Sequence, residues 1–348
     1  MGTSPGQSRG RLADLDDFGS NPGALRAKFY IPASFAKGAP LVVVLHGCTQ
    51  NAEGYDHNAG WSSAADDHGF ALLFPEQTRA NNPNLCFNWY LEADAARGHG
   101  EALSIRQMVA AMQARFGTDP SRVFVTGLSA GGAMTAVMLA SYPEVFAGGG
   151  IIAGLPFGIA HSVPQAFDRM RGHGGPTGEA LSDLVRAASN HSGAWPTLSI
   201  WHGSGDLIVD PRNAQDLIEQ WGALHGVSRK PSRTDEIEGY PHRTWCDHAG
   251  RPVIEEYSIT GMAHGTPLDT NGTTGEVAGA HMLEAGISST RQLLRFWAVA
   301  EPVAKVQSAR VPVARPPRRA SASRQPEYAG SDIGKTIEQA LRSAGLLR

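Results

Sequence analysis

A serine enclosed by small residues is the first candidate for chemistry in this sequence. In the stretch VFVTGLSAGGAMTAVMLA, residues 123–140, Ser129 follows an apolar run typical of a strand and precedes a helical pattern. A strand, a tight turn of small residues and a helix form the context that lifts a nucleophilic hydroxyl out of a sheet. The alternative is a glycine-packed helix start capped by Ser129, because Gly-x-Ser-x-Gly is weak evidence in a chain with 41 glycines. A phosphate-binding loop is disfavoured, since no lysine follows the glycines.

An activated serine needs a base and an orienting acid. Where the serine sits on a strand-to-helix turn of an α/β sheet, the acid follows it in the chain and the histidine comes last. Asp206 is the acid candidate because it follows the apolar run TLSIWHG, and open α/β sheets place their sites at the carboxyl ends of strands. Asp210, four residues further on, is the weaker alternative. His264 is the base candidate, since it follows the run VIEEYSIT in a glycine-flanked loop.

The remaining histidines fit a catalytic role less well. His202 lies inside an apolar run and is interpreted as a packed core residue, whereas His242, His248 and His281 lie in polar or helical context. The segment HRTWCDH, residues 242–248, contains metal-binding residue types, but its spacing matches no established ligand pattern. We therefore expect neither a metal nor another cofactor.

Acyl transfer also needs donors for the oxyanion that develops on the substrate. These are usually the amide that follows the nucleophile and one from the loop after an early strand. The first is the amide of Ala130. The second is expected from VVVLHGCTQ, where Gly47 allows close backbone approach and the Cys48 amide can point at the site. Cys48 as a nucleophile is the alternative, but no base accompanies it in the sequence, so we interpret it as structural.

The elements that must position these residues are short runs that are apolar on both faces and alternate with helical patterns. Such runs suit the interior of a parallel sheet covered by helices. We therefore predict an α/β domain over residues 25–300, with a doubly wound, mostly parallel sheet. Residues 155–196, rich in Gly, Pro and His, interrupt the alternation and are predicted to form a cap or insertion over one face. The runs are PLVVVLHG, FALLFPE, RVFVTGLS, GGGIIAG and TLSIWHG.

The two ends of the chain differ from this domain in composition. Residues 1–24 are polar and are expected to form a flexible lead, and no apolar signal segment is visible in them. Residues 301–330 are rich in Pro, Ala and Arg, which predicts a disordered linker, and residues 331–348 carry the pattern of an amphipathic helix. Nine Lys and Arg against four Asp and Glu make residues 301–348 basic, so the net charge of −3 leaves −8 for residues 1–300. That body is no candidate for nucleic-acid binding.

These stretches, taken in order, resemble the polyhydroxybutyrate (PHB) depolymerase family of α/β-hydrolase esterases, which also contains feruloyl and acetylxylan-type esterases. The resemblance spans about residues 25–298 and implies an α/β-hydrolase fold and a serine carboxylic-ester hydrolase. By position it implies Ser129 as nucleophile, Asp206 as acid and His264 as base, with the Cys48 and Ala130 amides as oxyanion hole. The matching motifs include HGCTQNAEGYDHNAGW, CFNWY, GLSAGGAM, WHGSGDLIVDPRNA and GMAHGTP.

Three further roles depend on the resemblance. Cys48 and Cys86 occupy positions whose pairing would hold the oxyanion loop against CFNWY, which leaves Cys246 as a free thiol. Trp89 and Gln50 are candidate substrate-binding residues, and a core or surface-cap tryptophan is the alternative for Trp89. The insertion at 155–196 is the other candidate for a wall that contacts the acyl group.

The expected substrate is an ester of 3-hydroxy acids, in a polyester or a soluble oligomer. Feruloyl or acetylxylan-type esters are the alternative, and a peptidase or a non-catalytic binding scaffold on the same fold are more remote. The resemblance favours an extracellular protein, whereas the missing signal pattern favours a cytoplasmic one. The basic tail is a candidate for docking on a polyester granule or membrane face, and a solvated linker with a packed helix is its alternative.

Overall fold

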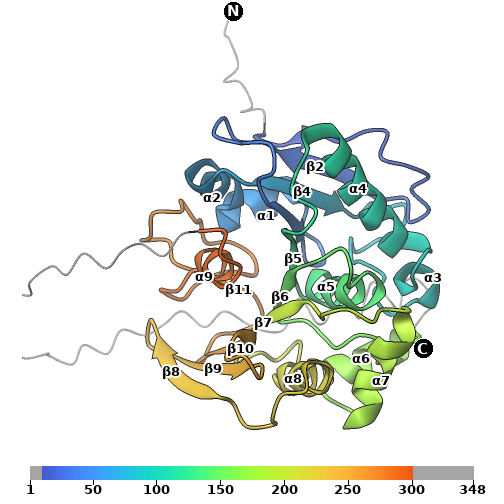
Figure 1. The fold of residues 1–348 in the computed structure, drawn as a ribbon, viewed down its shortest axis with the longest axis vertical. Coiled ribbons are helices and arrows are strands. Elements are labelled where there is room, and N and C mark those ends of the chain that lie inside the picture. The colour runs from blue at the N-terminus through green and yellow to red at the C-terminus, as the bar shows by residue number, and fades with distance from the viewer. Residues whose placement is uncertain (1–9, 301–348) are drawn as a thin grey trace, which may run out of the picture. The chain divides into compact units, whose positions relative to one another are not determined.

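The fold is built around one large sheet (Figure 1). The computed structural model describes residues 10–300, so the expected linker at 301–330 and helix at 331–348 lie outside the described residues. In the described part the sheet has ten strands in the order β1-β2-β4-β3-β5-β6-β7-β10-β9-β8. Its strands are β1 Ala13–Asp14, β2 Arg26–Tyr30, β3 Leu41–Leu45, β4 Ala71–Glu76, β5 Val123–Leu128, β6 Gly148–Ile152, β7 Thr197–Gly203, β8 Arg233–Ile237, β9 Tyr240–Cys246 and β10 Pro252–Ile259.

The six central strands, β4 to β10 in sheet order, pair in parallel, and the strands at both edges are antiparallel. Parallel neighbours require crossover connections, which the helices provide. The predicted doubly wound, mostly parallel sheet is therefore confirmed. The helices are α1 Ala52–Ala59, α2 Trp61–His68, α3 Glu92–Ala95, α4 Gly100–Phe116, α5 Ala130–Ser141, α6 Val163–Met170, α7 Glu179–Ala188, α8 Arg212–His225 and α9 Ser289–Phe296.

Both faces of the sheet are covered, which explains the continuous apolar runs. In β3, Leu41, Val43 and Leu45 pack into the core beneath α4, α5 and α8, whereas Val42 and Val44 pack into a second core with α1, α2 and α9. Figure 1 shows these two helix groups on opposite sides of the sheet. Side chains alternate between the faces of a strand, so a strand buried on both faces must be apolar at every position.

Part of the lead does not behave as expected. The described residues from 10 to 24 do not form a flexible segment, because Leu12 and Leu15 are buried and β1 pairs with β2. These two leucines lie on either side of the short strand and enter opposite cores. Their burial anchors the lead to the sheet edge.

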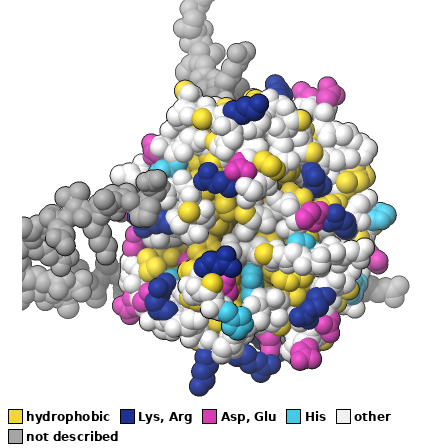
Figure 2. Space-filling model, in the orientation of Figure 1, with side chains coloured by type: hydrophobic (Ala, Val, Ile, Leu, Met, Phe, Trp, Pro, Cys, Tyr) yellow, Lys and Arg dark blue, Asp and Glu magenta, His cyan; other side chains and the backbone are white. Residues whose placement is uncertain are grey.

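The insertion at 155–196 contains the short helices α6 and α7, which lie between β6 and β7 in the chain. Ser162 caps α6, and α7 buries Leu181 and Val185 in the core that it shares with α8. In the described residues no helix is both long and apolar enough to span a membrane. Figure 2 shows side chains of both charges interspersed over the visible face.

A buried histidine holds the antiparallel edge of the sheet together. His242 of β9 contacts Asp235 of β8 through Nδ1 at 2.6 Å and Glu255 of β10 through Nε2 at 3.2 Å. Its ring also packs against Tyr257, with ring centroids 4.4 Å apart. Burial alone would lower the pKa of His242, but its hydrogen bonds with Glu255 and Asp235 raise it above the usual value. His242, the first of the two histidines in the HRTWCDH segment, thus belongs to an ion-paired network.

This network predicts a pH-dependent contribution to stability. Because the pKa of His242 is raised in the folded state, protonated His242 stabilises the fold fully below the ordinary histidine pKa of 6.5. This stabilisation is lost as pH rises through the raised pKa. We expect His242→Gln to lower the free energy of unfolding by about 2 kcal/mol at pH 6, because a buried charged contact is lost. The deficit should shrink at pH 9. Urea unfolding at both pH values measures it, with exposed His248→Gln as control, and a pH-independent deficit would contradict the assignment.

Candidate active site

Ser129 occupies a strained turn between β5 and α5. Its φ is +57° and its ψ −115°, a conformation that residues with a side chain rarely adopt. Its side chain makes no capping hydrogen bond, and its amide donates to the carbonyl of Ile152 at 2.9 Å. The structure therefore contradicts the alternative of a serine that only caps a helix.

The glycines beside Ser129 allow this turn. A Cβ on Gly127 would lie 2.5 Å from the backbone of Gly131, and a Cβ on Gly131 would lie 2.3 Å from the carbonyl oxygen of Leu45. Both distances are shorter than any real carbon contact, so neither position admits a side chain. Because these contacts are with backbone atoms, α5 can start directly beside β3 only if both residues are glycine.

The structure brings Asp206 and His264 into direct contact. Asp206 follows β7 and His264 follows β10, which are parallel neighbours, so both residues lie at the carboxyl edge of the sheet. Nδ1 of His264 donates to Oδ2 of Asp206 at 2.7 Å, and both side chains are buried. The rival Asp210 is exposed and instead accepts from the amide of Arg212 at the start of α8.

Asp206 is held as a carboxylate by several donors. Its Oδ1 accepts from the amides of Ile208 and Val209 at 2.8 and 2.9 Å. Burial would raise its pKa, but hydrogen bonds from His202, His264 and Val209 lower it well below the usual range. Asp206 therefore stays charged near neutral pH and can stabilise a positive charge on His264.

His202 contributes more than core packing. Its Nε2 donates to the carbonyl of Val209 at 2.9 Å and lies 3.4 Å from Oδ2 of Asp206. It therefore holds the turn that carries the acid and touches the acid itself. The available signal was its position four residues before Asp206, but its place inside an apolar run led us to assign it to the core.

Ser129 lies at the same edge as Asp206 and His264, because β5, β7 and β10 are all parallel strands of one sheet. No hydrogen bond joins Ser129 to His264 in the part of the chain that the structure describes. Catalytic hydrogen bonds in ligand-free sites are often long and tighten when substrate binds. The structure thus contains Asp206 and His264 as a preformed pair and Ser129 at a separate turn.

The loop after β3 is held in place by two side chains. Nδ1 of His46 donates to the carbonyl of Gly47 at 2.8 Å, and Nε2 accepts from the amide of Gln77 at 3.1 Å. Burial lowers the pKa of His46 and keeps it neutral, as this bonding requires. Gln50 accepts from the amide of Gly47 at 2.8 Å and donates to the carbonyl of Ala280 at 3.3 Å. Both ends of the Gln50 amide are therefore engaged within the protein.

Two backbone amides at this edge are free. Among the described residues, neither the Cys48 amide nor the Ala130 amide donates a hydrogen bond to another protein group. They follow β3 and β5, which are adjacent parallel strands, and Ala130 opens α5. The first amides of any helix lack an intrahelical partner and favour an anion, which applies to Ala130, whereas an unpaired amide in a loop, such as that of Cys48, is uncommon in folded proteins.

A disulfide joins Cys48 to Cys86, as the resemblance implies, and Cys246 is a free, half-buried thiol. The bond ties the oxyanion loop to the segment that precedes Trp89. That segment is also anchored by buried Glu101, which accepts from Gln77 at 2.6 Å and from the Asn88 amide at 2.8 Å. Burial and the nearby charge of Asp94 raise the pKa of Glu101 to about 8.

His281 contacts the loop that carries His264. Its Nδ1 donates to the carbonyl of His264 at 3.1 Å, and its own carbonyl accepts from Thr266 at 2.8 Å. Thr266 begins β11 (Thr266–Leu268), which pairs with β12 (Met282–Glu284). Sequence reasoning assigned no role to His281, because only the fold brings it beside a residue 17 positions earlier.

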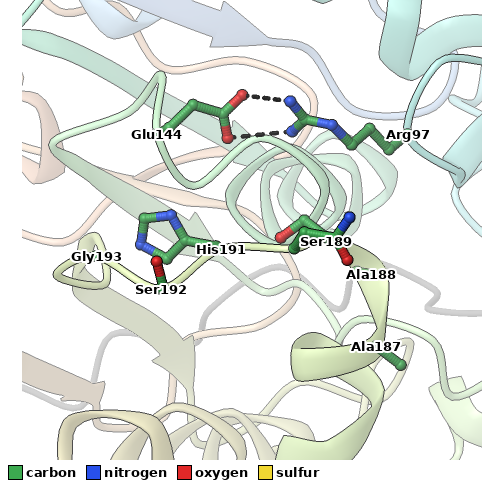
Figure 3. A pocket seen from close by; sticks show the side chains of 9 residues that line it. Arg97, Glu144, Ala187, Ala188, Ser189, His191, Ser192 and Gly193 are labelled. Atoms are coloured by element: carbon green, nitrogen blue, oxygen red, sulfur yellow. Dashed lines mark hydrogen bonds and ion pairs between the residues drawn. The ribbon is translucent and has the colours of Figure 1, made fainter.

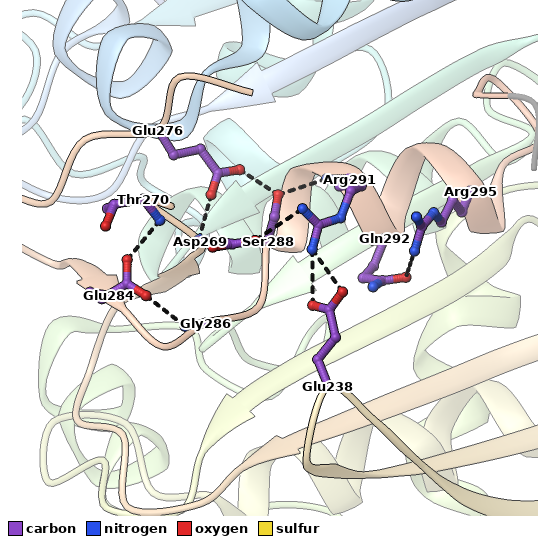
Figure 4. Close-up of polar contacts among 10 residues, drawn as sticks. All are labelled: Glu238, Asp269, Thr270, Glu276, Glu284, Gly286, Ser288, Arg291, Gln292 and Arg295. Atoms are coloured by element: carbon purple, nitrogen blue, oxygen red, sulfur yellow. Dashed lines mark hydrogen bonds and ion pairs between the residues drawn. The ribbon is translucent and has the colours of Figure 1, made fainter. Parts of the chain in front are cut away.

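Ion pairs hold the following segment in place (Figure 4). Glu238 lies at the turn between β8 and β9. Nη2 of Arg291, in α9, donates to both of its carboxylate oxygens, at 2.8 and 3.0 Å. Arg291 also donates to Asp269 at 3.1 Å, just after β11. Glu276 accepts from Ser288 at the start of α9 and from the Asp269 amide at 2.6 Å. The segment that follows His264 is therefore tied both to α9 and to the β8–β9 turn.

Trp89 is buried and packs edge-on against Tyr90, with ring centroids 5.5 Å apart. It also lines a groove with Phe157 and Leu184 of the insertion. The core interpretation and the wall interpretation therefore both describe part of its surroundings.

The comparisons with known proteins agree with this architecture. The chain is 44% identical over 291 residues to poly(3-hydroxyalkanoate) depolymerase C of Paucimonas lemoignei, covering 83% of this chain and 70% of that one. It is 30% identical over 269 residues to feruloyl esterase B of Talaromyces funiculosus, covering 75% and 74%. The solved structure of an acetyl xylan esterase from Aspergillus awamori superposes with a TM-score of 0.71 at 26% identity, covering 84% of this chain and all of that one.

The fold is that of the α/β-hydrolases, and the chain is a carboxylic ester hydrolase of the serine esterase type. A model of the family described as esterase PHB depolymerase matches residues 25–235, and the chain belongs to this family.

Removing the disulfide should affect both stability and turnover. In the chain-entropy view, a cross-link 38 residues apart stabilises by about 4 kcal/mol. We expect the double variant Cys48→Ser/Cys86→Ser to lose about 3 kcal/mol and to lower kcat about tenfold, because the Cys48 amide loses its tether. Guanidinium unfolding and ester hydrolysis measure the two effects. Cys246→Ser is the control, and full activity in the double variant would show that the tether does not position the loop.

The packing of α5 on β6 gives a matched glycine comparison. A Cβ on Gly132 would lie 2.9 Å from the Ile152 carbonyl oxygen and 3.1 Å from Cα of Gly154, whereas a Cβ on Gly222 of α8 would meet only Val227 at 3.6 Å. We expect Gly132→Ala to cost about 2 kcal/mol, and Gly222→Ala to be neutral or stabilising by up to about 1 kcal/mol from helix propensity. Thermal unfolding distinguishes them, and equal melting temperatures would refute the close-packing role.

Proposed function

We propose that Ser129 is the nucleophile, His264 the general base and Asp206 the orienting acid of this esterase. The observation that carries the proposal is the 2.7 Å hydrogen bond from Nδ1 of His264 to Oδ2 of Asp206. It lies at the same sheet edge as the strained turn of Ser129. Because Nδ1 carries the proton of that bond, Nε2 has a free lone pair that can accept the serine proton.

The free amides complete the proposed reaction. Ser129 Oγ attacks the ester carbonyl as its proton moves to His264, and Asp206 stabilises the imidazolium that results. The amides of Cys48 and Ala130 donate to the oxyanion of the tetrahedral intermediate, since both lack another partner in the described protein. His264 then protonates the leaving alcohol, and a water activated by the same residue releases the acid and restores Ser129.

For the substrate we propose esters of short 3-hydroxy acids, as polyesters or their oligomers. The likeness to a poly(3-hydroxyalkanoate) depolymerase, at 44% identity over 83% of this chain, supports this class over the feruloyl and acetylxylan esters of the relatives at 30%. An extracellular location and docking of residues 301–348 on a granule or membrane face are proposals that depend on the sequence alone.

Variants of the three residues test the assignment. With a nitrophenyl butyrate substrate we expect Ser129→Ala and His264→Ala to lower kcat by about 10^5-fold and Asp206→Asn by about 10^4-fold, because the triad acts as a unit. Asp210→Asn is the matched control, since this exposed carboxylate lies four residues from the acid and only caps α8. Retained turnover in Ser129→Ala, or an Asp210→Asn loss equal to that of Asp206→Asn, would overturn the triad.

The proposed substrate class is tested by measuring kcat/KM of the wild-type enzyme for 3-hydroxybutyrate oligomers, methyl ferulate and acetylated xylan at equal ester concentration. The highest kcat/KM is expected for the oligomers. A preference for either carbohydrate-type ester would replace the polyester proposal and leave the triad unaffected.

A further inference from the structure

The direction of the Cys48 amide is set by the peptide group to which it belongs. The carbonyl of Gly47, at the other end of that peptide group, accepts from Nδ1 of His46 at 2.8 Å. A trans peptide group is planar and points its N–H opposite to its carbonyl, so a contact that holds the carbonyl also orients the Cys48 N–H. The imidazole is itself held by the Gln77 amide, which donates to Nε2 at 3.1 Å.

Two further contacts hold Cys48 from its other sides. The amide of the next residue, Thr49, donates to the carbonyl of Asn84 at 2.8 Å. The side chain of Cys48 is bonded to Cys86. Both partners belong to the 77–91 loop, the residues between β4 and α3, which form neither helix nor strand. All the restraints on the proposed oxyanion donor therefore lead to one loop without regular structure.

Glu101 of α4 gathers donors from this loop at a single carboxyl group. Its Oε1 accepts from the side-chain amides of Gln77 at 2.6 Å, Asn81 at 3.1 Å and Asn88 at 2.8 Å. Its Oε2 accepts from the backbone amide of Asn88 at 2.8 Å. Glu101 is completely buried. Because Gln77 opens the 77–91 loop and Asn88 lies near its end, one carboxyl group holds both ends of the loop.

Among the described residues, no lysine or arginine pairs with Glu101. Arg97, four residues earlier in the chain, instead donates to both oxygens of Glu144, at 2.7 and 3.1 Å (Figure 3). Burial and the nearby charge of Asp94 raise the pKa of Glu101 to about 8. A protonated carboxyl oxygen keeps lone pairs, so both oxygens accept hydrogen bonds in either protonation state. Glu101 therefore holds the 77–91 loop through four neutral donors and without an ion pair.

We propose that Glu101 is a positioning residue for the reaction, because it fixes the 77–91 loop and, through that loop, the direction of the Cys48 amide. This role rests on the proposed function, in which that amide stabilises the oxyanion. An oxyanion forms in both acylation and deacylation, so a misdirected amide slows both steps. Loss of the positioning role therefore lowers kcat and leaves KM nearly unchanged, whereas damage to substrate binding raises KM.

Glu101→Gln provides the sharpest test, because a side-chain amide has one acceptor oxygen and an NH2 group in place of the other. In either orientation this NH2 faces an N–H of Gln77 or Asn88, so at least one buried donor loses its acceptor. With nitrophenyl butyrate we expect kcat to fall about twentyfold, less than the loss of about 10^2- to 10^3-fold when an oxyanion donor is removed outright. KM should stay within about twofold of the wild-type value, because substrate binding is unaffected.

A tetrahedral inhibitor measures the oxyanion contact directly. In an alkyl trifluoromethyl ketone, Ser129 Oγ bonds to the carbonyl carbon, the electron pair of the C=O π bond forms the oxyanion, and the serine proton passes to His264. The inhibition constant in Glu101→Gln should therefore rise by the same factor as kcat falls. Asn81→Ala removes one of the four donors and should change both quantities in the same direction by about threefold. If Glu101→Gln does not fold, the result for Asn81→Ala decides.

Glu255→Gln is the matched control, since Glu255 is also a buried carboxyl group but bonds to Ser199 of β7 at 2.6 Å and His242 of β9 at 3.2 Å. Its kcat and inhibition constant should equal those of the wild type. Wild-type values in the folded Glu101 and Asn81 variants, or an equal loss in Glu255→Gln, would overturn the positioning role. Failure of the proposed function gives a different result, because Ser129→Ala would then keep its turnover and the ketone would not inhibit the wild type.

Discussion

The sheet edge that carries Ser129 depends on the close approach of α5 to the backbones of β3 and β6. Gly131 lies against the carbonyl of Leu45, and Gly132 lies against the carbonyl of Ile152, at distances that leave no room for a Cβ. These glycines allow α5 to begin directly after the turn that places Ser129 at φ +57°. The Ala130 amide, as the first of the helix, has no partner in the described protein and points away from the helix body at the same place.

The other parts of the site are loops, and each is fixed by polar contacts with a neighbouring segment. Gln50 links the loop after β3 to Ala280, and the next residue, His281, donates to the carbonyl of His264. The disulfide to Cys86 ties the same loop to the segment before Trp89. Because these contacts connect elements far apart in the chain, displacement of one loop is expected to affect the others. A preformed arrangement of donors lowers the reorganisation that the reaction requires.

The fold also explains how one domain can combine a buried acid with an open binding surface. Asp206 needs a dry environment rich in donors, which the turn after β7 and His202 provide. The insertion between β6 and β7 leaves the sheet at the same edge and forms a wall over α5. The insertion can therefore vary without displacing Asp206 and His264, which follow the strands β7 and β10.

The sequence by itself indicated the alternation of strands and helices, the turn at Ser129 and the candidates Asp206 and His264, because apolar periodicity and small-residue turns are local signals. It also indicated the two amides that we propose as oxyanion donors, since strand ends are recognisable. Only the tertiary structure decided the contacts of His202, His281 and Gln50 and the burial of Leu12 and Leu15. Each of these depends on contacts between residues distant in the chain, and no local pattern records which partner a polar or apolar side chain will meet.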